Sequence, residues 1–100
     1  MPPSTLADAL DAALDAYDEL TELGEDVEDE WSYIQDLTGA WRARLDVVRA
    51  ARGDDALDPT VVTALETAAA QIRSVEDPHR AIDWLSTYPQ VVLLALGETP

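Results

Sequence analysis

Hydrophobic residues recur at steps of three or four along most of this chain. The clearest series lies between residues 31 and 48 and comprises Trp31, Ile34, Leu37, Trp41, Leu45 and Val48. An α-helix has 3.6 residues per turn, so this spacing places all six side chains on one stripe of a helix. Because two of the three tryptophans lie on that stripe, we interpret the stretch as the central helix of a small all-α bundle.

The same periodicity, together with signals for helix ends, predicts further helices on both sides. Asp58 and Asp77 each precede a proline, and an Asp cap followed by proline is a strong start signal. Ser4 or Thr5 can cap a first helix, while the glycines that suit helix ends are Gly24, Gly53 and Gly97. We predict one domain over residues 1–100, with antiparallel neighbours and helices at about 5–23, 26–52, 59–75, 78–87 and 89–96.

Pro89 interrupts the last of these patterns. A proline inside a helix removes one hydrogen bond and clashes with the preceding turn, so we expect a break or kink near Thr87–Tyr88. Residues 90–96 would then form a short final helix. A strand is disfavoured there, because the sequence offers no second strand to pair with it. The predicted fold is therefore three long helices plus a proline-kinked C-terminal helix.

The charge of the chain is strongly negative. The chain contains 21 Asp and Glu residues and six Arg residues, which gives a formal net charge of −15, and lysine is absent. This composition resembles that of proteins from salt-accumulating halophiles, in which molar salt screens the self-repulsion of an acidic surface. A basic partner or nucleic-acid mimicry is the less favoured alternative, because the acidic residues are spread along most of the chain.

Several classes of protein are disfavoured by what the sequence lacks. Cysteine is absent, which excludes disulfides, thiolate nucleophiles and cysteine zinc sites. No basic patch is visible, so nucleic-acid binding is not expected. The N-terminal region lacks a basic segment typical of signal peptides, and the longest apolar run, 91–96, is too short to span a membrane. We expect a cytoplasmic protein that binds no membrane.

Residues that could carry chemistry are few. His79 is the only histidine, no Glu-x-x-His motif occurs, and no glycine-rich phosphate loop is present. We expect no metal, no cofactor and no catalytic site, and therefore not an enzyme. Asp36 and Asp83 are the only mild candidates for a buried acid that could catalyse a reaction. The loop acids Asp54, Asp55 and Asp58 lack the spacing of a calcium loop.

Two regions contain more apolar residues than a small bundle needs to bury. One is a second apolar line on the predicted central helix, at Tyr33, Ala40 and Val47, and the other is the apolar run near the C-terminus. Gly39, inside that central helix, could allow the close approach of another helix or of a partner's ring. We predict a homodimer through the second and last helices, with interface residues Tyr33, Gly39, Ala40, Val47, Val91, Val92, Leu94 and Leu96.

These observations favour a small acidic helical protein that acts as a non-catalytic protein-interaction or regulatory module. The alternative is a bundle that binds a small ligand in an aromatic-lined pocket. In that case the lining residues would be Trp31, Trp41, Trp84 and Tyr88. The partner, the pathway and any ligand stay open at this point.

Overall fold

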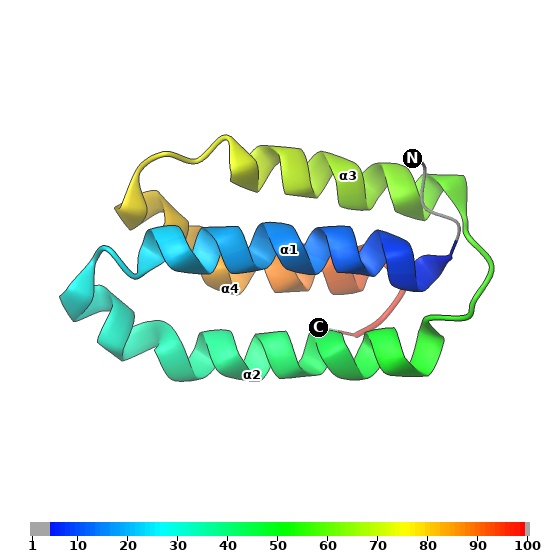
Figure 1. Ribbon diagram of the computed structural model, residues 1–100, viewed down its shortest axis with the longest axis horizontal. Helices are drawn as coiled ribbons and strands as arrows, with labels where there is room; N and C mark the ends of the chain where they lie inside the picture. The colour runs from blue at the N-terminus through cyan, green and yellow to red at the C-terminus, as the bar shows by residue number, and fades with distance from the viewer. Residues whose placement is uncertain (1–4, 100) are drawn as a thin grey trace.

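The structure is a computed structural model that describes residues 5–99 and consists of four α-helices (Figure 1). They are α1 (Leu6–Gly24), α2 (Glu28–Arg52), α3 (Pro59–Arg73) and α4 (Pro78–Ala95). No strand occurs among the described residues, and the helices pack together along their lengths. The predicted all-α bundle is confirmed.

Three helices begin where the capping signals indicate. The side chain of Thr5 accepts a hydrogen bond from the backbone amide of Asp8 at 3.2 Å. Asp58 and Asp77 each accept one from the amide two residues later, at 2.9 Å, directly before the prolines that open α3 and α4. Each oxygen satisfies an N–H group that the first turn of a helix leaves unpaired. Ser4, the alternative cap of α1, lies outside the described residues.

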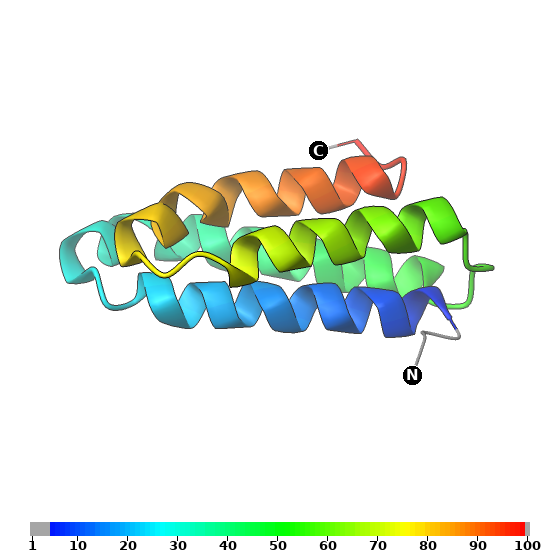
Figure 2. The same ribbon diagram turned by 90° about the horizontal axis from the view of Figure 1, so that it is seen from above.

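The centre of the bundle is formed by α1 and α4. Each of these two helices contacts all the others, whereas α2 and α3 do not contact each other. In Figures 1 and 2, α2 and α3 flank α1 on opposite sides and α4 packs behind α1. The chain runs antiparallel in the pairs α1–α2, α3–α4 and α1–α4. The loop between α2 and α3 crosses one end of the bundle, which leaves α2 parallel to α4 and α1 parallel to α3 (Figure 1).

The most deeply buried helix is α1, so the interpretation of residues 31–48 as the central helix is wrong. Nine of the 19 residues of α1 are buried, against two of the 25 residues of α2. Alanines on several sides of α1 allow three helices to pack around it. By contrast, α2 lies at the edge and contacts only α1 and α4, so its tryptophan rings are only half-buried.

The buried stripe of α2 also differs from the predicted one at a single position. Leu37 is 45% exposed, while the adjacent Thr38 is buried. Steps of four and then three from Ile34 lead through Thr38 to Trp41, whereas the prediction took three and then four. Both paths fit a period of 3.6, so hydrophobicity alone favoured the leucine.

Helix α4 continues through Pro89, so the predicted break near Thr87–Tyr88 and the separate helix 89–96 are wrong. Proline has no N–H, so the carbonyl of Leu85, four residues earlier, loses its helical partner. The hydroxyl of Tyr17 on α1 donates a hydrogen bond to this carbonyl at 3.0 Å. A buried carbonyl left unpaired would cost about 1–3 kcal/mol. The helix persists because α1 supplies the donor that proline lacks.

Tyr17 belongs to a reciprocal pair that joins the two central helices. The hydroxyl of Tyr88 on α4 donates to the carbonyl of Ala13 on α1 at 2.9 Å. The two tyrosine rings stack with their centroids 5.9 Å apart, and neither side chain is exposed to solvent. Each ring therefore contributes apolar area to the core while its hydroxyl satisfies a backbone group of the opposite helix.

The C-terminal end of α4 is fastened to the end of α2. Gly97 has a φ of 75°, and this left-handed turn brings the amide of Glu98 to 2.9 Å from the carbonyl of Leu93. Arg52 on α2 donates to the carbonyl of Leu96 at 2.6 Å and pairs with Glu98 at 3.0 Å. A cation is favoured at this position, because carbonyls at a helix C-terminus carry partial negative charge.

We expect Tyr17→Phe to lower the free energy of unfolding by about 1–3 kcal/mol, because the Leu85 carbonyl then has no donor. Tyr88→Phe is the matched control, and it should cost less, because the Ala13 carbonyl lies within the continuous helix α1 and keeps its helical bond. Pro89→Ala restores an N–H to α4, so Tyr17→Phe should be less damaging in that background. Denaturant titration of the four variants would measure this coupling, and an equal cost of Tyr17→Phe with proline or alanine would contradict it.

Stability should also fall at alkaline pH through the same pair. Burial raises the pKa of Tyr17 and of Tyr88 from 10.0 to about 12. The folded state thus holds these protons more tightly than the unfolded state. Their stabilising contribution is complete below pH 10 and is lost as the pH rises toward 12. Denaturation measured across this range should show a weaker pH dependence in the double variant Tyr17→Phe/Tyr88→Phe, and an unchanged dependence would refute the assignment.

Candidate protein-interaction surface

A line of exposed residues runs along α2 at helical spacing. Tyr33 is 93% exposed, Leu37 45% and Val47 67%, and Ala40 and Arg44 are also exposed. Steps of four, three, four and three join these five positions, so they lie on one side of the helix. We call them the α2 line. The sequence pattern found Tyr33, Ala40 and Val47, but it assigned Leu37 to the core and did not include Arg44.

At its N-terminal end the α2 line borders a shallow pocket between α2 and α4. The apolar side chains of this pocket are Tyr33, Ile34 and Ile82, and Ser86 also lines it. Its remaining lining residues are all acidic, namely Asp29, Glu30 and Asp83. The pocket therefore suits an apolar side chain that has a cationic neighbour.

The prediction that Val92 and Leu96 form an interface is wrong, because both are buried in the core. Their exposed fractions are 1% and 6%. Val92 lies on the inner stripe of α4 with Leu85 and Tyr88, and Leu96, the residue that caps the helix, continues that stripe. Only the outward-facing members of the predicted set on this helix stay accessible, with Val91 36% and Leu94 63% exposed.

Gly39 does not serve close packing within the chain. A Cβ atom added at this position would meet nothing within 4 Å, and the residue is exposed. The expected approach of another helix of the same chain is therefore wrong. Contact with a partner's ring at this position stays a prediction.

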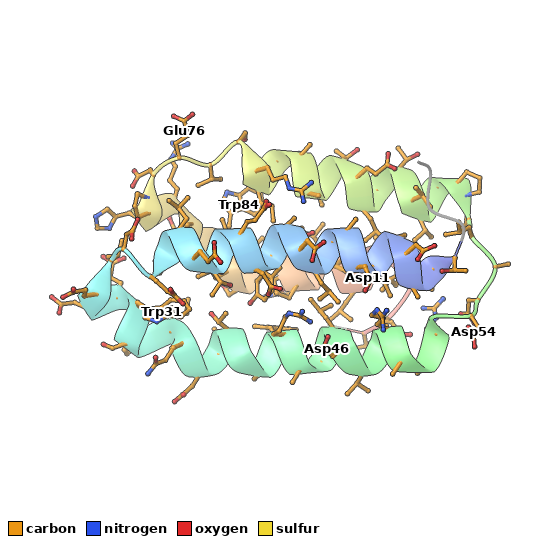
Figure 3. The ribbon with its side chains drawn as sticks, in the orientation of Figure 1. Asp11, Trp31, Asp46, Asp54, Glu76 and Trp84 are labelled. Atoms are coloured by element: carbon orange, nitrogen blue, oxygen red, sulfur yellow. The ribbon has the colours of Figure 1, made fainter. Side chains whose placement is uncertain are left out.

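The four aromatic residues proposed for a ligand pocket do not come together. Tyr88 is buried in the core, and Figure 3 shows Trp31 and Trp84 on opposite sides of α1. Trp84 lines a different open pocket, beside Val75 and Arg80. Trp41 buries its indole nitrogen without a hydrogen-bond partner in the described chain, as Thr38 does with its hydroxyl oxygen. The prediction of a shared aromatic pocket is wrong, because the bundle places these rings at separate positions.

Most arginines are held by carboxylates of the same molecule. Arg42 and Arg49 on α2 pair with Asp18 and Asp11 on α1, at 3.0 and 2.5 Å (Figure 3 labels Asp11). On the other side of α1, Arg73 on α3 pairs with a glutamate at 2.9 Å. These pairs join the outer helices to α1 and raise the pKa of Arg42 and of Arg49 through their carboxylate partners. Because 21 acidic residues outnumber six arginines, the surface stays negatively charged even with these pairs formed.

The groups considered for catalysis are exposed or serve the fold. Asp36 and Asp83 are both exposed, so neither of them is the buried catalytic acid for which they were considered. His79 lies 3.2 Å from a carboxylate oxygen of Glu30 on the surface. Among the loop acids, Asp55 pairs with Arg52.

Neither a metal cluster nor a membrane-spanning helix occurs among the described residues. Within residues 5–99 no three His, Asp or Glu side chains are grouped so that they could hold a metal ion. None of the helices in that range is long and apolar enough to cross a membrane. No protein-family model, curated protein or solved structure matches this chain.

We expect the protein to become more stable as KCl is raised from about 0.1 M to about 1 M, which shortens the Debye length from about 10 Å to about 3 Å. Screening relieves the repulsion of a net charge of −15, while exposed ion pairs of about 0–1 kcal/mol each lose little. The control Asp15→Asn/Glu22→Gln removes two exposed carboxylates of α1 and should reduce the salt dependence. Denaturant titration at each salt concentration measures this, and stability that falls with KCl would contradict it.

Proposed function

We propose that the protein is a non-catalytic protein-interaction module whose contact surface is the α2 line. The observation that carries the proposal is the exposure of Tyr33, which presents a whole aromatic ring to solvent on a well-formed helix. Leu37 and Val47 extend the same line, so the exposed apolar groups are gathered rather than scattered. Gathered apolar side chains with a polar border are typical of protein-binding sites, where tyrosine is among the enriched residues.

The charges around the line indicate what kind of partner would bind. The acidic residues of the neighbouring pocket favour a partner with an apolar side chain beside an arginine or lysine. At low salt an acidic partner would be repelled by the net charge of −15, and molar KCl screens this repulsion. The proposed ligand is therefore a protein surface that is apolar at its centre and basic at one end.

We infer that the protein works in the cytoplasm of a salt-accumulating cell. A surface rich in Asp and Glu and free of lysine supports this, because such a surface is best tolerated where molar salt screens it. In that solvent, apolar contacts gain importance over long-range charge attraction. An apolar line on α2 suits these conditions.

Affinity capture from a native lysate in about 1 M KCl tests the proposal, because ionic bystanders are screened at this salt concentration. The tagged protein is compared with Val47→Asp on the line and with Ala64→Asp, a matched charge change at an exposed position of α3. Helix α3 does not contact α2, so the control leaves the α2 line unchanged. We expect Val47→Asp to lose a protein partner that Ala64→Asp retains. A set of captured proteins that is the same for all three would refute the proposal.

A further inference from the structure

The residues of the α2 line are complementary to the same line read in the opposite direction. A two-fold axis that passes beside Ala40 places each residue of one helix at the level of the residue equally far from position 40 on the other. Tyr33 then lies at the level of the partner's Val47, and Ala40 meets the partner's Ala40. Arg44 lies at the level of the partner's Asp36. Each of the unlike contacts occurs twice in such a pair.

The charges of α2 favour this antiparallel direction over a parallel one. Glu28, Asp29 and Glu30 form its first turn, whereas its four arginines all follow position 41. Parallel pairing would place like charges side by side, with Arg44 beside the partner's Arg44. Antiparallel pairing instead places Arg44, the one arginine of α2 without an ion pair in the described chain, at the level of the partner's Asp36.

Both members of the proposed ion pair are accessible. Asp36 is exposed and forms no ion pair in the described chain. Arg44 is exposed and donates one of its hydrogen bonds to the carbonyl of Thr99. A guanidinium group has five N–H donors, so this bond leaves donors for a second carboxylate.

Small residues at the middle of the line would allow two helices to approach closely. Ala40 and Ala43 are both exposed. Their methyl groups let two helix axes come closer together than longer side chains would. The larger side chains, Tyr33 and Val47, lie toward the two ends of the line. In an antiparallel pair, Tyr33 of one copy would pack against Val47 of the other copy.

We propose that the protein forms a two-fold dimer in which the α2 helices of two copies pack antiparallel and cross near Ala40. This inference rests on the proposed function, because it names a second copy of the chain as the occupant of the same surface. The line from position 33 to position 47 is about 21 Å long, which is short for a stable interface. The dimer fraction should therefore increase with protein concentration, and also with KCl, which screens the repulsion between two acidic copies.

Disulfide trapping tests the arrangement directly, because the chain contains no cysteine of its own. The single variant Ala40→Cys places two thiols face to face at the proposed axis. Val47→Cys places them about 21 Å apart, far beyond the reach of a disulfide. Ala64→Cys on α3 is the control for random collisions. We expect Ala40→Cys to form linked dimers roughly tenfold faster than the other two under mild oxidation, because the interface raises the effective thiol concentration.

Each outcome decides the proposal. Linking of Ala40→Cys at the rate of Ala64→Cys would refute the dimer, and equally fast linking of Val47→Cys would refute its antiparallel direction. A mixture of Tyr33→Cys and Val47→Cys should link in the mixed pair and not within either variant. The proposed function is judged separately, because a refuted dimer leaves open whether Val47→Asp loses a different protein in the capture experiment.

Discussion

The hydrogen bond from Tyr17 to the Leu85 carbonyl allows a proline to lie in the middle of a central helix of the bundle. Without that donor, α4 would contain a buried carbonyl with no partner at the point where it crosses α1. With it, the apolar residues on both sides of Pro89 stay on one continuous stripe and pack against α1. The division of the C-terminal apolar segment into a buried and an exposed side follows from this continuity. Val92 and Leu96 are buried, while Leu94 is left outside.

Helix α1 takes part in both the apolar and the ionic contacts of the bundle. Its inner residues contact three helices, and its outer acids hold arginines from α2 on one side and from α3 on the other. Exposed ion pairs add little stability individually, and these lie on the sides of α2 and α3 that face α1. With Arg42 and Arg49 turned toward α1, the residues of the α2 line are directed elsewhere. The arginines that pair with α1 and the apolar residues that remain exposed thus lie on different sides of α2.

The helices were predictable from sequence because their signals are local. Asp58 and Asp77 specify their helix starts through a bond that spans two residues, and such spacings can be read directly. The continuity of α4 was not predictable, because the donor that compensates for Pro89 lies 68 residues before the carbonyl it satisfies. That Thr38 and not Leu37 lies in the buried stripe of α2 was also not predictable, because it depends on the position of α2 at the edge of the bundle. Within the surface site, heptad spacing revealed Tyr33, Ala40 and Val47, whereas Leu37 required the fold.

The absence of contact between α2 and α3 has a mechanical consequence. The contacts arrange the four helices as the corners of a rhombus, in which α1 and α4 touch across the short diagonal and α2 and α3 lie at the two far corners without touching. Either outer helix can tilt or shift against the α1–α4 pair without straining the other, and the cost is limited to its own contacts. Helix α2, which carries the α2 line, contacts only α1 and α4, so a shift of α2 changes fewer contacts than a shift of α1 or α4 would. If α2 shifts, the contacts of α3 with α1 and with α4 stay as they are.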